Sequence, residues 1–148
     1  MAKKKPDDAA AGNGRAAPVS YTHLTLPDGM RIFAPTGSAD ENNAGLCVLA
    51  AGEKYEILMT GDLSEQAEYR LLSTHALPRA AVLVAGHHGA ATSTSEALLR
   101  AIRPEAVLIS VGADNRFGHP ADETLRRIEK AGAAVFRTDL SGTITIRG

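Results

Sequence analysis

The sequence predicts an α/β fold with a mixed β-sheet, in which some strands are parallel and joined by crossover helices. Two observations lead to this prediction. Short apolar runs bounded by glycine, proline and charged residues recur along the chain, as strands do. In the second half these runs alternate with segments whose apolar residues recur every three to four positions, as on one face of a helix. Strand–helix–strand units of this length imply parallel strands, because the connection must return across the sheet.

The composition excludes several classes of protein. The 148 residues include 16 basic and 17 acidic side chains, so the overall charge does not indicate nucleic acid or an anionic membrane. No apolar run approaches membrane-spanning length, and the lysine-rich start lacks the apolar region of a secretory signal. We therefore expect a soluble chain. The single cysteine, Cys47, cannot form an internal disulfide and is predicted to be a small buried side chain.

The first 27 residues differ from the rest. Met1–Pro18 combine alanine, glycine, proline and charge without periodicity, which is typical of a disordered tail. The stretch "VSYTHLTLP", Val19–Pro27, resembles the translation of an adaptor used in sequencing libraries; the alternative is a natural short strand. We favour the adaptor. Residues 1–27 are then expected to lie outside a partial domain that spans 28–148.

Three strands and a helix are expected next. Apolar runs between turn residues predict strands at Met30–Pro35, Gly45–Ala51 and Lys54–Thr60. In the segment that follows, Leu63, Ala67 and Leu71 are spaced four apart, which places them on one helical face. Ser64 is the expected N-cap of this helix.

The second half alternates strands with helices. A helix from Thr94 to Ile102 is expected to start at a capping box made by Ser93 and Glu96, and another runs from Asp122 to Ala131, just before Gly132. Strands are predicted at Ala80–Ala85, Ala106–Val111, Ala134–Thr138 and Gly142–Ile146, the last two joined as a hairpin across "DLSG".

Polar residues follow the predicted parallel strands at the points where the strands end. Because these ends meet at one edge of a sheet, the side chains are expected to lie close together where ligands bind. Histidine and carboxylate side chains together form the ligand set of zinc or manganese. The hydroxyl run Thr92–Ser95 opens a helix, whose first amides favour an anion such as a phosphodiester. The residues at this edge are Asp62, His87, His88, Asn115, Arg116, His119 and Asp139.

Several of these residues also have a structural interpretation. Asp62 can belong to the turn before a helix, and His119 can shape the entrance to the next one. Thr92–Ser95 can cap their helix. Asp139 in "TDLSG" is favoured as a hairpin turn residue, and His75, just past a helix, is expected at the surface.

Four segments, taken in order, resemble the C-terminal metallo-β-lactamase-fold domain of ComEC, the DNA internalisation-related competence protein. The resemblance covers residues 28–146. It departs from the family pattern at Ala90, where a serine is expected, and no upstream H-x-[HD]-x-D-H loop is found in this chain. It therefore implies the C-terminal half of the αββα sandwich only. The matching segments are "NNAGLCVLAAGEKYEILMTGDLSEQAEYRLL", "VLVAGHHGAATSTS", "AVLISVGADNRFGHP" and "RTDLSGTITI".

The resemblance also implies roles for individual residues. Asp62 matches the carboxylate that bridges two metal ions, and His87 matches a metal ligand, with His88 as the alternative. His119 would be a general acid or a phosphate contact, so that Asp62 and His119 are the expected catalytic residues. The residues expected to bind substrate or phosphate are His88, Thr92, Ser93, Asn115, Arg116 and His119.

The complete domain implied by the resemblance would hold divalent zinc or manganese, activate a water and cut DNA, degrading the strand that is not imported. This chain supplies too few ligands for a stable dinuclear site, so we expect it to be inactive on its own. Expected partners are DNA, the missing N-terminal half of the fold and the membrane channel of the parent. The parent would lie at the bacterial cell membrane, with this domain extracytoplasmic.

An uncovered sheet face and edge would also favour self-association of the isolated chain. Two alternatives remain open. One is a hydrolase of the same fold that acts on another phosphodiester, such as a choline or nucleotide ester. The other is a non-catalytic half-fold used for binding or scaffolding.

Overall fold

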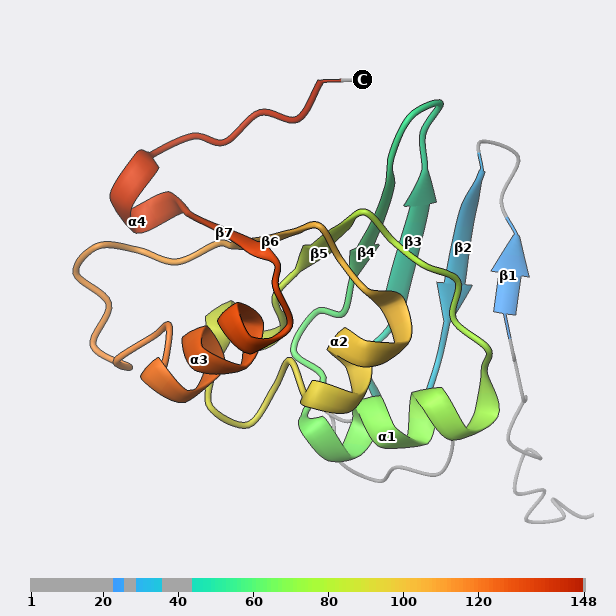
Figure 1. Ribbon diagram of the computed structural model, residues 1–148. Coiled ribbons are helices and arrows are strands. Elements are labelled where there is room, and N and C mark those ends of the chain that lie inside the picture. The colour runs from blue at the N-terminus through green and yellow to red at the C-terminus, as the bar shows by residue number, and fades with distance from the viewer. Residues whose placement is uncertain (1–22, 26–28, 36–43, 148) are drawn as a thin grey trace, which may run out of the picture.

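A computed structural model describes residues 23–25, 29–35 and 44–147 of the chain, and these form one mixed sheet with helices (Figure 1). The strands are β1 (His23–Thr25), β2 (Met30–Phe33), β3 (Cys47–Ala51), β4 (Glu56–Met59), β5 (Val82–Val84), β6 (Ala106–Ile109) and β7 (Ala134–Arg137). The helices are α1 (Glu65–Thr74), η2 (Gly86–Gly89), α2 (Glu96–Ile102), α3 (Asp122–Lys130) and α4 (Thr138–Ser141).

The sheet follows the chain order from β1 to β7. Strands β1 to β4 pair antiparallel, and β4 to β7 pair parallel through crossover connections. The predicted α/β class, with a mixed sheet and βαβ crossovers, is confirmed. The parallel part brings the carboxyl ends of four strands to one edge, which is where the sequence places the polar residues.

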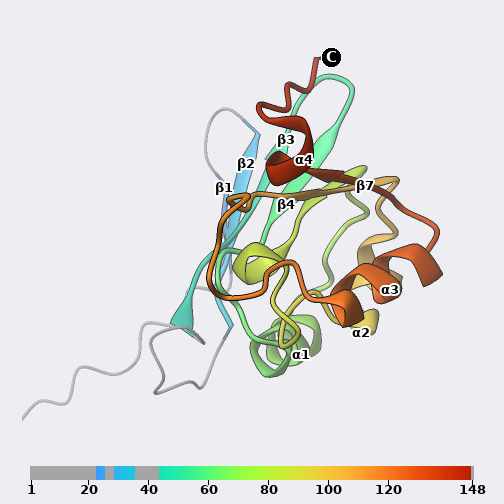
Figure 2. The same cartoon turned by 90° about the vertical axis from the view of Figure 1, so that its left-hand side faces the viewer.

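Helices α1, α2 and α3 lie on one side of the sheet (Figures 1 and 2). The pairing register aligns Leu49, Leu58 and Leu83 in one row across β3, β4 and β5, and all three are fully buried. Helix residues such as Leu71 and Leu98 are also fully buried in this core. The core therefore occupies the space between the sheet and the three helices.

The other face of the sheet is also apolar but is not fully buried. Successive side chains of a strand point to opposite faces, so the residues next to the buried row lie on the side without these three helices. The pairing register joins six of them into a second row, which runs across six strands. This uncovered row consists of Ile32, Val48, Met59, Val84, Leu108 and Phe136. Among the described residues, α1, α2 and α3 cover one side of the sheet and leave this row uncovered, which is consistent with half of an α/β sandwich.

Helix α2 begins later than the sequence predicts. Its N-cap is Ser95, whose hydroxyl accepts the backbone N–H of Leu98 at 3.2 Å, and not Ser93. Ser93 is unavailable as a cap because its hydroxyl donates to the carbonyl of Gly86 at 2.7 Å. The cap at Ser64 of α1 is confirmed by a bond from the N–H of Ala67.

The predicted closing hairpin is wrong. After β7 the chain forms the single turn α4, and residues 142–147 contain no strand. The hydroxyl of Thr138 accepts the N–H of Val111 at 2.7 Å and donates to its carbonyl at 2.8 Å, which fixes the exit from β7. Asp139 therefore lies in α4, where it pairs with Arg137 instead of forming a hairpin turn.

The structure describes only part of the N-terminal segment that the sequence sets apart from the domain. Of the first 27 residues, the structure describes His23–Thr25, which form β1 with His23 opposite Phe33. The expected tail and the rest of Val19–Pro27 lie outside the described residues, so the domain boundary at residue 28 stays a prediction. In the described ranges no helix has the length and apolar character needed to cross a bilayer.

Cys47 lies in β3 and is fully buried, as its apolar neighbours predict. Burial, followed by the nearby charge of Glu68, raises the pKa of its thiol to about 12. Only the thiolate reacts with alkylating agents, and at pH 8 about one such thiol in ten thousand is ionised. We expect native protein to resist iodoacetamide at pH 8 and to be fully labelled in denaturant, as intact mass measures. Rapid labelling of the native protein would contradict this burial.

Candidate functional site

The two adjacent histidines lie in η2, directly after β5. His87 and His88 both have left-handed backbone conformations, with φ of 48° and 57°. Side chains with a Cβ adopt this region at a cost of about 1–2 kcal/mol per residue. Two such residues in succession persist only where surrounding contacts hold them, and here four segments hold the turn or the residues that follow it.

The hydroxyl run after the histidines supplies the first set of contacts. The Ser93 hydroxyl donates to the carbonyl of Gly86, and the N–H of Gly86 donates to the Thr94 hydroxyl at 3.1 Å. Ser93 and Thr94 are fully buried, whereas Thr92 is exposed. The Ser93 hydroxyl is thus turned into the protein and not toward a phosphate, and only Thr92 of the predicted pair faces solvent.

Glu68 of α1 supplies the second set. Its two carboxylate oxygens accept the backbone N–H groups of Thr94 and Ser95, each at 2.7 Å, and the side chain is fully buried. Burial raises the pKa of this carboxyl, and the hydrogen bonds from Ser95 and Thr94 oppose the rise. The sequence analysis missed Glu68. The available signal was its position three residues before Leu71, which places an acidic side chain on the apolar face of the helix.

Helix α3 supplies the third set. The Thr124 hydroxyl donates to the carbonyl of Ala90 at 2.8 Å, and Arg127 donates to the carbonyls of Ala91 and Ser93. These bonds fix the segment that follows the histidines.

The loop before α3 packs just as closely against η2. A Cβ placed on Gly89 would lie 2.7 Å from the Cβ of Pro120, and Gly89 has a φ of 81°. Only glycine fits this position. The loop that carries His119 is therefore locked against the histidine turn.

The three predicted histidines are brought together. The ring centroids of His87 and His119 are 5.8 Å apart, and those of His87 and His88 are 6.4 Å apart. Nδ1 of His88 lies 2.7 Å from the carbonyl oxygen of Ser110. Because a carbonyl only accepts, Nδ1 donates this hydrogen bond, which in the neutral ring places the lone pair on Nε2. Desolvation, and then the charges of His87 and His88, lower the pKa of His119.

Asp62 lies at the same edge but in a separate turn. It is exposed, and the carbonyl of its neighbour Gly61 accepts the N–H of His87 at 3.0 Å, which ties the two turns together. Thr60, just before them, is fully buried, and its hydroxyl has no hydrogen-bond partner among the described residues.

The donors present only partly fit a metal ion. Imidazoles and a carboxylate are the correct donor types for zinc or manganese. In the part of the chain that the structure describes, however, no three His, Cys, Asp or Glu side chains gather closely enough to hold one. The described residues thus offer a partial ligand set.

The loop from Gly112 to His119 is folded around Asn115. The Asn115 side chain accepts the N–H of His119 at 2.9 Å and donates to the carbonyls of His119 and Gly112 at 2.7 and 2.9 Å. Both amide protons are used, so Asn115 shapes the loop. The exposed Arg116 has its guanidinium carbon 5.7 Å from the ring centroid of Phe117. A phosphate contact by Arg116 stays a prediction.

The surface position predicted for His75 is wrong. It is 9% exposed, its Nε2 lies 3.2 Å from the carbonyl oxygen of Ala34, and its ring packs edge-on against Phe33. The surface prediction relied on the position of His75 just past a helix. The apolar residues around it in the sequence were the signal for burial.

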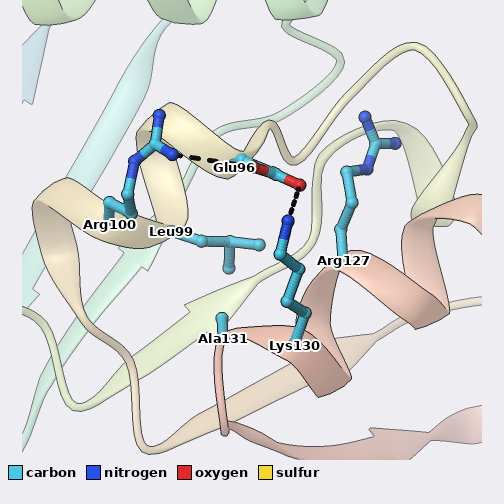
Figure 3. Close-up of a pocket in the computed structure, with 6 residues that line it drawn as sticks. All are labelled: Glu96, Leu99, Arg100, Arg127, Lys130 and Ala131. Carbon is cyan, nitrogen blue, oxygen red and sulfur yellow. Dashed lines mark hydrogen bonds and ion pairs between the residues drawn. The ribbon is translucent and has the colours of Figure 1, made fainter.

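A cavity of about 180 Å³ lies between α2 and α3 (Figure 3), and no histidine lines it. The Glu96 carboxylate accepts a hydrogen bond from Lys130 at 2.9 Å and forms an ion pair with Arg100 at 3.6 Å. The hydrogen bond and charge of Lys130 hold the pKa of Glu96 below its ordinary value. The two cations outnumber the one carboxylate in this group, and exposed pairs of this kind contribute little stability.

Comparison with known proteins found relatives along most of the chain, although no family model matches it. It is 33% identical over 109 residues to ComE operon protein 3 of Bacillus subtilis (strain 168), covering 74% of this chain and 14% of the relative. It is 37% identical over 108 residues to Competence protein ComA of Neisseria gonorrhoeae (70% and 15%). Identity to Recombination protein 2 of Haemophilus influenzae is 35% over 106 residues (71% and 13%). The chain thus spans only about a seventh of these relatives.

Proposed function

Because this chain belongs to the ComEC family of competence proteins, we propose that it forms half of a metal-dependent phosphodiesterase domain that degrades the DNA strand left outside during uptake. The observation that carries this proposal is the gathering of three imidazoles, from His87, His88 and His119, at the carboxyl edge of the parallel strands. This edge is where parallel sheets bind ligands. The Asp62 turn adds a carboxylate at the same place.

Each residue has a distinct part in this proposal. Asp62 and His87 are metal ligands, and His88 presents Nε2 with its lone pair because Ser110 fixes the proton on Nδ1. His119, Arg116 and the exposed Thr92 contact the scissile phosphate. When bound, the metal would lower the pKa of a water molecule so that it attacks the phosphodiester.

The missing ligands would come from another part of a longer protein. The relatives are about seven times as long as the segment they share with this chain. The uncovered row on the sheet fits the same arrangement, since a second sheet packed on it would complete a sandwich. We infer that the other half of the domain covers this face and completes the metal site.

The test is metal affinity in the longest form of this protein that its gene encodes, measured by calorimetry with Mn²⁺ and Zn²⁺. We expect His87→Ala to weaken binding by at least about 10- to 100-fold, the loss typical of changing a group that only supports a metal ligand, and to slow hydrolysis of single-stranded DNA. His75→Ala is the matched control, because His75 is buried beside Phe33 and lies outside the site. Unchanged affinity in both His87→Ala and His88→Ala would refute the proposal and leave a non-catalytic module.

A further inference from the structure

Phe117 is an exposed aromatic residue next to the histidines. It is 71% exposed, in the loop between β6 and α3. One side of its ring stacks on His119, with centroids 6.0 Å apart and planes inclined by 20°. The guanidinium group of Arg116 lies over the same ring. Because the Arg116 side chain is long and exposed, it can turn aside, and the ring then offers a surface for another flat ring.

This ring stands on a fixed support. Three hydrogen bonds from the Asn115 side chain close the loop on both sides of Phe117. His119 is followed by Pro120, which packs directly against Gly89. The loop is therefore ordered before a ligand stacks on Phe117. Binding then loses less conformational entropy, which favours it.

Phe117 also forms one wall of a cavity of about 190 Å³. The lining is mostly apolar, with imidazoles at one side, and the cation of Arg116 stands next to it. An apolar slot beside a cation matches a nucleotide, whose base is flat and apolar on its faces and whose phosphate is anionic. The residues around the cavity are His88, Val111, Gly112, Asn115, Phe117 and His119.

We propose that this cavity binds an unpaired base of the DNA strand by stacking on Phe117, with Arg116 holding an adjacent phosphate. Bases in a duplex already stack on their neighbours, whereas a base of a single strand can be turned outward onto an aromatic side chain. The site would therefore select single-stranded over double-stranded DNA and place the strand beside the histidines. The choice of DNA as ligand rests on the function proposed above.

The chain contains no tryptophan, so Phe117→Trp introduces a single fluorescent reporter at the site. The probes are an oligothymidylate and an abasic oligonucleotide of the same length and charge, titrated into the full chain. We expect saturable quenching by the oligothymidylate with an affinity at least about fivefold above that of the abasic strand. Tyr69→Trp on α1, where Tyr69 is 52% exposed, is the control reporter and should show no base-dependent quenching.

A second variant tests the ring without a reporter. Phe117→Leu keeps an apolar side chain but removes the stacking surface, so fluorescence anisotropy with labelled strands should show no preference for base-bearing over abasic DNA. Equal affinity for the two strands in the wild type would overturn the proposal, as would an undiminished preference in Phe117→Leu.

The outcome is separable from that of the proposed function. A base preference in this chain, together with no metal uptake by the longest form of the protein that its gene encodes, supports the stacking site and refutes the phosphodiesterase. Metal uptake and hydrolysis without a base preference refute the stacking site alone.

Discussion

Replacing Glu68 by alanine is expected to lower the free energy of unfolding by roughly 3–5 kcal/mol, as measured by urea denaturation. The side chain is fully buried and accepts the N–H groups of Thr94 and Ser95. A buried donor left without an acceptor costs about 1–3 kcal/mol, and this substitution leaves two. The loss should also reach the histidines, because Thr94 in turn accepts the N–H of Gly86.

Glu68→Gln separates shape from hydrogen bonding. Glutamine fills the same space but presents an N–H₂ group where one carboxylate oxygen stood, facing a backbone donor. We therefore expect a loss of about 1–3 kcal/mol from that one amide. Glu129→Ala, at an exposed position of α3, is the matched control and should stay within about 0.5 kcal/mol of the wild type. A wild-type stability in Glu68→Gln would show that the bond to the replaced carboxylate oxygen contributes nothing.

The pH dependence provides a second check on Glu68. Burial raises the pKa of its carboxyl above the ordinary value of 4.5, so the unfolded state releases this proton first as the pH rises. The stability advantage of the wild type over Glu68→Gln is therefore complete below the unfolded-state pKa. It decreases as the pH rises through the higher folded-state pKa, down to the loss of about 1–3 kcal/mol expected when the carboxylate is ionised. An advantage that grows with pH over this range would contradict the direction of the shift.

The general fold could be predicted because its signals are local. The apolar run of β5 and the four-residue spacing on α1 indicate their elements without reference to the rest of the chain. The convergence of His87, His88 and His119 could also be predicted, since the carboxyl ends of parallel strands share one edge. What the pattern could not give is the orientation of each side chain at that edge.

The errors arise where tertiary contacts decide. Ser93 fits a helix cap by its spacing, but the nearby Gly86 carbonyl takes its hydroxyl. Thr138 prevents the closing hairpin by bonding to Val111, 27 residues earlier. The burial of His75 depends on a neighbour on β2, Phe33, that is distant in sequence. In each case the residue type has a common local role, but a contact with a residue elsewhere in the fold determines where its side chain lies.

Produced alone, this chain is expected to self-associate through the apolar face opposite α1, α2 and α3. The uncovered row crosses six paired strands, and its central member, Val84, lies on β5 between Met59 and Leu108. Burying an apolar side chain of this size contributes about 1.5–3 kcal/mol. Val84→Lys should therefore weaken association by at least about tenfold, since 1.4 kcal/mol is one decade in affinity. Sedimentation velocity over a range of concentrations measures the effect.

The control for this face is Tyr69→Lys. Tyr69 is about half exposed on α1, on the helical side of the sheet, so a charge placed there should leave association unchanged. A chain that stays monomeric at all concentrations, or one that responds equally to both substitutions, would contradict a role for the uncovered row. If the other half of the domain covers this face, the longer protein should be monomeric, and Val84→Lys should then reduce its stability instead of its association. Val84→Lys thus reports self-association in the isolated chain and domain packing in the longer protein. In both forms another apolar surface would cover the uncovered row.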